Sequence, residues 1–433
     1  MKRKIALAAV LAVLPAITAV CRDAAGEAGK PTSPMGQTDS ASDLFGTRSG
    51  YVHPFFGISE WYTDNLFNRS EGERTDFTTV FSPGIWFALP ASDVRLLDMR
   101  TLNVAPGGLA VSRFEEPTPG RYQSYLLYEG GYEALAKNSS QDTMNHRAEG
   151  RFRYNARRGL SLDVTDQFLK THDPWSTGVS LGLDKYYSNY ADVAASYDTG
   201  GRLTASAGYS NYRIQYTASR NDDRDRTDNT FRGAVGYRVE PKTSVLLEYE
   251  HANIDYDQDE LIRDSTEDRM YAGAEWDVTA KSRGKVRAGY GIKDGDDMDG
   301  KDLLLELQGQ QFFTPQTSLR VLAARRVNET VIPDTNFIVS YSVYAEYVQR
   351  FTTKFSGTVT ASYTNDRYDG DVTFDGVTES RDDGIYTGGI SFGWDPRRWF
   401  NTTVGYEYTL RDSTFNDFDY SKNTVYLALR GGL

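Results

Sequence analysis

The chain closes with the residues IYTGGISFGW (385–394), DPRR (395–398) and FNTTVGYEYTL (400–410), followed after a loop by TVYLALR (424–430). In the middle pass, apolar side chains alternate with polar or small ones: Val404, Tyr406, Tyr408 and Leu410 against Thr403, Gly405, Glu407 and Thr409. Because successive side chains of a strand point to opposite faces, this period of two predicts strands with one apolar and one polar face. The turn residues between the passes predict long antiparallel hairpins.

The same alternation recurs from Tyr51 onward, in segments longer than the ~5–6 residues usual for strands of soluble proteins. These segments begin near Val52, Asp76, Gln123, His146, Leu160, Asn189, Leu203, Thr230, Ser244, Arg269, Lys285, Asp302, Leu319, Phe337, Phe355, Gly384, Phe400 and Asn423. A single-chain bacterial outer-membrane barrel has an even number of strands. We therefore predict an all-β fold over residues 51–433, a transmembrane antiparallel up-and-down β-barrel of about 18 strands (roughly 16–20).

Short and long connections alternate along the chain, as they do between the two ends of such barrels. The compact turns are 156–159, 198–201, 240–243, 314–317 and 395–398. The long, acidic connections are expected at 220–229, 255–268, 293–301 and 366–383. This alternation predicts short periplasmic turns and longer outside loops, with both termini in the periplasm of a bacterial outer membrane.

One long insertion, residues 91–121, stands where a tight turn is expected, and it carries several apolar residues, among them Met99, Leu102 and Leu109. It could form an extra hairpin, which would raise the strand count. It could also fold into the lumen or hang on the periplasmic side. The sequence leaves these alternatives open.

The alternation also assigns the two faces of the sheet. Phe152, Leu247 and Tyr290 lie on apolar faces, opposite charged neighbours. An Arg or Lys facing the middle of the lipid bilayer would cost ~2–4 kcal/mol, so the charged face is the inside. The predicted lumen-lining residues, which would form the transport path, are Glu149, Arg151, Arg153, Arg232, Arg238, Glu248, Glu250, Glu275, Arg287, Glu306, Arg320, Glu346 and Glu407.

The composition favours a membrane barrel over a soluble sandwich. The chain has 29 Tyr, 21 Phe, 6 Trp and 39 Gly, with a mean hydropathy of -0.55. Its apolar faces mix small residues with aromatic ones, whereas a sandwich core prefers packed Val, Leu and Ile. Aromatic residues near strand ends are expected to form interface girdles: Trp61, Trp86, Trp276, Trp394 and Trp399. A lumen of this width leaves an aqueous channel unless a segment plugs it.

The first 21 residues have the charged start and apolar stretch of a secretory signal peptide. Residues 22–50 are rich in small and polar residues without periodicity, which predicts a flexible periplasmic linker. Cys21 is the one cysteine, so a disulfide within the chain is excluded. Cys21 could be lipidated or could simply mark the cleavage zone.

No catalytic motif is present, and we predict that the protein is not an enzyme. The four histidines are scattered, and no nucleophile, zinc or phosphate-loop motif occurs. We expect no cofactor, no metal site and no nucleic-acid partner. The acidic stretch 294–300 misses the register of a calcium loop. The expected surroundings are outer-membrane lipid and lipopolysaccharide.

The opening residues PFFGISEWYTDNLF (54–67), with Asp76-Phe77 and Ser82-Pro83-Gly84, resemble the start of the outer-membrane family called putative β-barrel porin 2. The ending GYEYTLRDS (405–413) and YSKNTV (420–425) is similar to the last hairpin of that family. The chain departs from the family in its insertion at 91–121 and in ending on Leu433 in place of an aromatic residue. The family includes barrels found with exopolysaccharide export systems. The resemblance implies a polysaccharide cargo and a periplasmic polysaccharide export protein as partner, and no catalytic residues.

We therefore predict an outer-membrane channel that secretes a polysaccharide. The alternatives are a general diffusion porin and a plugged, surface-exposed barrel whose acidic loops bind a ligand. The barrel prediction also requires residues 425–430 to pair with residues 52–62, because no strand edge can stay open in lipid.

Overall fold

The computed structural model describes residues 50–90, 99–113, 120–173, 183–258, 264–279, 281–295, 298–330, 332 and 335–432. The predicted signal peptide and all but the last residue of the predicted linker lie outside the described residues. No helix among the described residues is long and apolar enough to cross a membrane.

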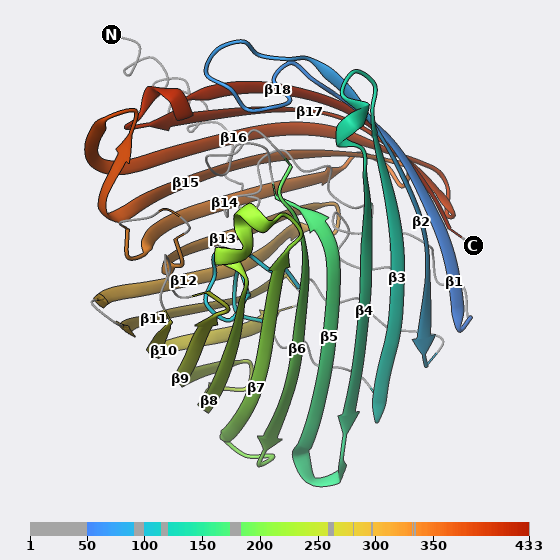
Figure 1. Ribbon diagram of the computed structural model, residues 1–433. Coiled ribbons are helices and arrows are strands. Elements are labelled where there is room, and N and C mark those ends of the chain that lie inside the picture. Colours follow the sequence, from blue (N-terminus) through green and yellow to red (C-terminus); the bar gives the residue numbers. More distant parts are fainter. Residues whose placement is uncertain are drawn as a thin grey trace.

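The described chain forms one closed antiparallel sheet of 18 strands (Figure 1). Each strand pairs with its neighbours in sequence, so the barrel is of the up-and-down type. The strands are β1 (Val52–Thr63), β2 (Asp76–Leu89), β3 (Tyr122–Leu135), β4 (Thr143–Asn155), β5 (Leu160–His172), β6 (Lys185–Asp198), β7 (Leu203–Tyr216), β8 (Arg226–Glu240), β9 (Thr243–Tyr256), β10 (Ser265–Thr279), β11 (Ser282–Gly295), β12 (Met298–Thr314), β13 (Thr317–Asn328), β14 (Ile338–Arg350), β15 (Phe355–Phe374), β16 (Val377–Arg397), β17 (Phe400–Ser413) and β18 (Tyr420–Gly432).

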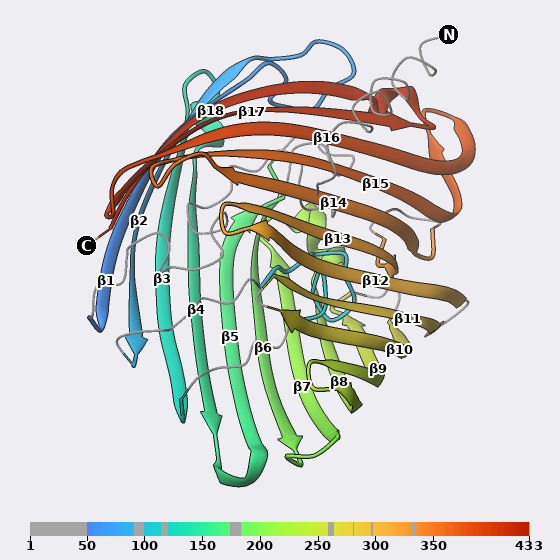
Figure 2. The same cartoon turned by 180° about the vertical axis from the view of Figure 1, so that it is seen from behind.

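The first and last strands close the barrel. β1 pairs antiparallel with β18, with Ile58 opposite Leu429 and Trp61 opposite Tyr426. Figures 1 and 2 show the two strands side by side from both directions. The predicted closure and strand count are confirmed. Closure leaves no unpaired strand edge, which is the condition for burying a sheet in hydrocarbon.

The two faces of the sheet separate as the alternation predicts. The outer face exposes large apolar side chains, such as Leu247 at 66% and Leu126 at 65%, while the inner face buries Glu149 and Arg287. The girdle prediction is wrong for two tryptophans. Trp61 stacks on Tyr426 at 4.5 Å, and Trp86 stacks on His53 at 4.3 Å and is 4% exposed. Both occupy inward positions of their strands: Trp61 alternates with the outward Glu60 and Tyr62, and Trp86 with the outward Ile85 and Phe87.

The two ends of the barrel differ. At one end, which also holds the start of β1 and the end of β18, the turns are short and include η3 (Arg157–Gly159); we call it the short-turn end. The other end, the long-loop end, carries η2 (Ser139–Gln141), η4 (Ser219–Arg224) and η5 (Asn416–Phe418).

Two connections expected to be long loops are strand extensions instead. β15 and β16 run through most of 366–383, and β11 and β12 take up most of 293–301. The β15–β16 hairpin turns at Asp375 and Gly376, whose φ angles are +48° and +78°. Positive φ at both central residues of an Asp-Gly pair is typical of a tight hairpin turn. Residues 366–383 therefore form a hairpin with β-favouring residues on both sides of its turn, although their acidic composition led us to expect a loop.

Candidate functional site

Residues 99–113, between β2 and β3, lie inside the barrel, and we call them the inner segment (Figures 1 and 2). The segment folds on itself through a bridge between Thr101 and Leu109. Backbone hydrogen bonds from Leu102 N to Gly108 O (2.9 Å) and from Ala110 N to Arg100 O (2.9 Å) brace it. The described part of the insertion thus adds no strand to the barrel and occupies the lumen.

Two glycines allow the inner segment to lie against the wall. Gly107 and Gly108 have φ angles of +76° and +78°. A Cβ atom on Gly108 would come within 2.3 Å of the Tyr212 ring, and one on Gly107 within 2.6 Å of the Thr230 hydroxyl. Glycine is required at both positions for its backbone freedom and for the absence of a side chain.

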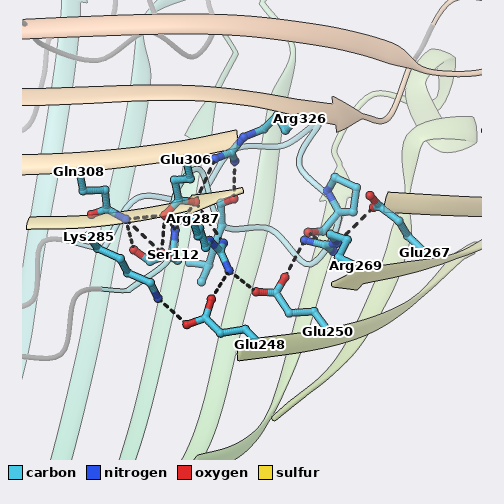
Figure 3. A network of polar contacts seen from close by, with 12 residues as sticks. Ser112, Glu248, Glu250, Glu267, Arg269, Lys285, Arg287, Glu306, Gln308 and Arg326 are labelled. Carbon is cyan, nitrogen blue, oxygen red and sulfur yellow. Dashed lines mark hydrogen bonds and ion pairs between the residues drawn. The ribbon is translucent and has the colours of Figure 1, made fainter. Parts of the chain in front are cut away.

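The first anchor of the inner segment is its Ser112, which binds Glu306 of β12 (Figure 3). The Ser112 backbone N lies 3.2 Å from Glu306 Oε2, and the Ser112 hydroxyl donates to Glu306 Oε1. Gln308 Nε2 donates both to Ser112 O at 2.8 Å and to Glu306 at 2.7 Å. One carboxylate of the wall therefore holds the segment through its main chain and a side chain.

Glu306 in turn belongs to a network of charges on β9, β11 and β12 (Figure 3). Arg287 is at its centre. Its Nη1 lies 2.8 Å from both Glu248 and Glu250, and its Nη2 lies 3.1 Å from Glu306. The guanidinium also covers the ring of Tyr271, 3.9 Å from its centroid. Buried charges persist when they are paired and hydrogen-bonded, as these are.

Two further arginines of the wall hold carbonyl groups of the inner segment. Arg326 Nη1 donates to Leu109 O at 3.1 Å, and Arg269 Nη2 donates to Pro106 O at 3.4 Å. Arg269 is itself paired with Glu250 at 3.0 Å. Main-chain oxygens of the segment are thus satisfied by cations that the wall already holds in place.

The second anchor is Arg113, which spans two aspartates on neighbouring strands. Its guanidinium lies 2.5 Å from Asp192 on β6 and 3.2 Å from Asp163 on β5. Each aspartate also has a partner in the wall, Arg151 at 2.5 Å for Asp163 and Arg232 for Asp192. The wall therefore keeps its own ion pairs when Arg113 is absent.

The third anchor lies nearer the long-loop end, around Asp228. Gly107 N donates to Asp228 Oδ2 at 2.8 Å, and Arg226, paired with Asp228 at 2.9 Å, also donates to Ala105 O. Close by, Glu329 N donates to Val104 O at 2.7 Å, and the Glu329 carboxylate pairs with Lys293.

An apolar cluster completes the contact. Met99 is packed among Tyr186, Tyr190, Tyr212 and Ile214 on β6 and β7, with Leu109 at the edge. Tyr190 and Tyr212 are 0% exposed. Inward tyrosines that would otherwise face water are covered, which stabilises the segment by burial of apolar area.

The pKa values of two charged groups at the anchors are shifted. Burial opposes the charged form of Glu329, but Lys293 and Arg226 outweigh it and hold the pKa of Glu329 below its ordinary 4.5. Burial also opposes the charge of Arg113, yet Asp163 and Asp192 raise the pKa of its guanidinium. Both groups are therefore charged at neutral pH, and the anchors are ionic.

The predicted lumen-lining residues lie on the inner face, but they fall into separate groups. Glu248, Glu250, Arg287 and Glu306 form the network of Figure 3. Arg151, Arg153 and Arg232 belong to the Asp163–Asp192 group, and Glu149 accepts from Arg147, Gln167 and Tyr125. Arg238 forms an ion pair with Asp198 near the short-turn end. The others are placed by the strand register: Arg320 lies opposite Glu346, Glu275 opposite Lys285, and Glu407 opposite Thr424.

The prediction missed several residues that complete these groups: Asp163, Asp192, Arg226, Asp228, Arg269, Lys285 and Arg326. Asp163 stands between Leu162 and Val164, so the alternation carried the signal that it faces inward. No local pattern in the sequence predicts which of these residues contact the inner segment.

The inner face of β15–β17, on another part of the wall, has a different character. Its residues between the outward Val359, Ile390, Phe392 and Val404 are mostly threonine, serine and glycine. The anchors of the inner segment described above end on β5–β8, β10, β12, β13 and Glu329. The lumen therefore has a charged wall that holds the segment and a hydroxyl-bearing wall formed by other strands.

A closed barrel with an apolar outside and a polar, ion-paired inside is the architecture of outer-membrane β-barrels. The family described as Putative beta-barrel porin 2 matches residues 101–432, and the chain belongs to that family. The expected family is confirmed; the match includes the last hairpin, whereas the opening residues 54–84 lie before its start. The protein is an outer-membrane, porin-like channel.

Several solved outer-membrane porins are similar to the chain at low identity. The chain is similar to OpdK from Pseudomonas aeruginosa, at 10% identity and a TM-score of 0.42, covering 88% of this chain and 99% of that one. It is also similar to a BenF-like porin from Pseudomonas fluorescens Pf-5, at 9% identity and a TM-score of 0.44, covering 88% and 99%. The chain is also similar to OccK2 (OpdF) from P. aeruginosa, solved in complex with glucuronate, at 10% identity and a TM-score of 0.44. The match covers 88% of this chain and 96% of that one. No curated protein matches the chain.

Proposed function

We propose that the protein is a passive channel for polar solutes whose lumen is narrowed from one side by the inner segment. The observation that carries this proposal is that the anchors of the segment, among the residues that the structure describes, lie on one side of the barrel. Its anchors at Ser112, Arg113 and Gly107 end on the charged wall. A segment held against one wall narrows an aqueous lumen of this size and leaves room beside it.

We also propose that the short-turn end and both termini face the periplasm. In barrels of this class the short turns are periplasmic and the longer loops are outside. The inner segment connects β2 to β3 at the short-turn end, so it would enter the lumen from the periplasmic side.

Polysaccharide secretion is the second candidate. The threonine- and serine-rich inner face of β15–β17 favours it, because hydroxyl groups can exchange hydrogen bonds with a hydrated sugar chain. The cargo would be the polysaccharide, and a periplasmic polysaccharide export protein would dock on the short turns. Neither candidate requires an enzymatic step or a cofactor.

Planar-bilayer recordings of the purified full chain test the first candidate. The unaltered protein should show single-channel conductance, and replacing residues 99–113 by a glycine-serine linker should increase it. A chain that conducts in neither form is no channel. Surface polysaccharide that stays unchanged after deletion of the gene would exclude the second candidate while leaving the first intact.

A further inference from the structure

Six hydroxyl residues on three neighbouring strands face the lumen together, and we call them the hydroxyl strip. They are Thr358, Thr360 and Ser362 of β15, Thr387 and Ser391 of β16, and Thr403 of β17. All six are half-buried, whereas the outward residues between them, such as Val359 and Ile390, are exposed apolar side chains. The strip is therefore accessible from the lumen and not from the lipid.

The strand register brings these hydroxyls side by side. Thr358 is opposite Ser391, and Ser362 is opposite Thr387. Glycine separates them: Gly389 stands opposite Thr360, and a Cβ atom there would lie 2.6 Å from the Thr360 hydroxyl. Because glycine has no side chain, the Thr360 hydroxyl has the space that it needs on the inner face.

Two hydroxyls of the strip have partners on the wall: Thr387 lies 3.4 Å from the Thr409 hydroxyl, and Thr403 donates to Asn401 at 3.1 Å. The other four are not engaged by the described residues. Within the described ranges, Thr358, Thr360, Ser362 and Ser391 make no side-chain hydrogen bond, in contrast to the carboxylates that surround Arg287. Tyr344 of β14, opposite Ser362, adds a second sign: it is 1% exposed, and its hydroxyl has no partner among the described residues. Buried hydroxyls are normally paired, so an ordered water beside Ser362 is the partner expected for the Tyr344 hydroxyl.

Charge is sparse at the strip. The inward charged residues beside it are Glu346 on β14, Glu407 on β17, and Lys422 and Arg430 on β18; Glu346, Glu407 and Arg430 each have interactions of their own. Towards the long-loop end, Asp383 pairs with Arg381 at 2.9 Å and with Arg411 at 2.6 Å, and Asp366 accepts from Ser340 at 2.5 Å. Glu407, for example, interacts electrostatically with Lys422. The strip therefore offers a row of hydrogen-bond donors and acceptors, and the charges beside it are paired within the protein.

We propose that the hydroxyl strip is the path of the cargo and that the cargo is an uncharged, hydroxyl-rich molecule of the sugar type. A hydroxyl both donates and accepts, so successive strip positions can exchange hydrogen bonds with successive sugar hydroxyls. An ion would find no compensating charge there. This proposal rests on the proposed channel function and names the substrate class that the channel favours.

The test uses the full chain in proteoliposomes and in planar bilayers. The variant T358V/S362A/S391A removes three hydroxyls while keeping similar shapes. We expect it to slow glucose flux by about threefold to tenfold, the effect of losing one or two net hydrogen bonds. Its conductance in potassium chloride should stay near that of the unaltered chain. Glucose should also pass the unaltered channel faster than glucuronate, which has the same ring and one negative charge.

A matched control removes one threonine and two serine hydroxyls from the inner face of β6 and β7, in the variant T204V/S196A/S206A. It should leave glucose flux unchanged, as should T358S/S362T/S391T, which keeps every hydroxyl of the strip. Unchanged glucose flux in the strip variant, equal loss in the control, or a parallel fall in ion conductance would overturn the proposal. A chain that passes neither ions nor glucose would overturn the channel function itself.

Discussion

Arg287 on β11 and Glu306 on β12 stand opposite each other in register, and their side chains pair at 3.1 Å inside the lumen. The same Glu306 carboxylate accepts from the backbone of Ser112. One ion pair of the wall therefore also positions the segment that narrows the channel, so stability and conductance are linked through this pair.

Replacing Arg287 with Met should destabilise the barrel by about 1.5–3 kcal/mol, because Glu248, Glu250 and Glu306 would lose their charged hydrogen bonds to a shared cation, although Lys285, Arg269 and Arg326 remain beside them. Urea unfolding in detergent, followed by tryptophan fluorescence, measures the change. Arg238→Met is the matched control, since its partner Asp198 is 48% exposed, and it should cost less than about 1 kcal/mol. Equal losses in the two variants would contradict the central role of Arg287.

Replacing Arg113 with Ala should free the inner segment at one anchor with little effect on the wall. Asp163 and Asp192 keep Arg151 and Arg232 as partners, so no buried carboxylate is left unpaired. We expect noisier single-channel currents with a higher mean conductance, and nearly unchanged unfolding. A quiet channel of unaltered conductance would show that this anchor does not position the segment.

Gly108→Ala should displace the inner segment from Tyr212. The new methyl group would meet the ring at 2.3 Å, and φ at this residue is +78°. Gly200→Ala separates the two effects, because Gly200 has a φ of +74° with nothing within 4 Å of the added Cβ. Backbone strain of about 1–2 kcal/mol should appear in both variants. Only the Gly108 variant should change conductance; a conductance change in both would contradict the contact with Tyr212.

Acid should weaken the anchor at Glu329. The folded pKa of Glu329 lies below its ordinary 4.5, so its ionised carboxylate stabilises the fold above that pH. This contribution is lost as pH falls from 4.5 through the lowered folded pKa. Glu329→Gln should therefore be less stable than the unaltered chain at pH 7, and the gap in thermal midpoint should narrow on acidification. The exposed Glu71→Gln serves as control and should show no such gap; a gap for Glu329→Gln that is constant with pH would rule out the ionic contribution.

The strands and their closure were predictable because their signal is local. Alternation at positions such as 404–410 follows from the geometry of a single strand, and the pairing of β1 with β18 follows from the requirement that no edge meets lipid. The same reasoning failed where composition was used in place of alternation. Trp61 was assigned to a girdle because it is aromatic, and 366–383 was assigned to a loop because it is acidic.

The inward side of the charged residues was likewise predictable, but their partners were not. Arg287 was expected in the lumen from its own strand, whereas its three carboxylates come from two other strands, β9 and β12. Their meeting depends on the register and stagger of the neighbouring strands, which no single strand encodes.

The sequence by itself determined the barrel, its approximate size, its outward and inward faces and its family resemblance, because each rests on local periodicity or on motifs within one segment. Only the tertiary structure decided that residues 99–113 lie in the lumen and that they bind one wall. That placement depends on contacts such as Ser112–Glu306 and Arg113–Asp192, between residues distant in sequence. Such pairs become neighbours only when the sheet has closed around the segment, and their charges are then satisfied by one another.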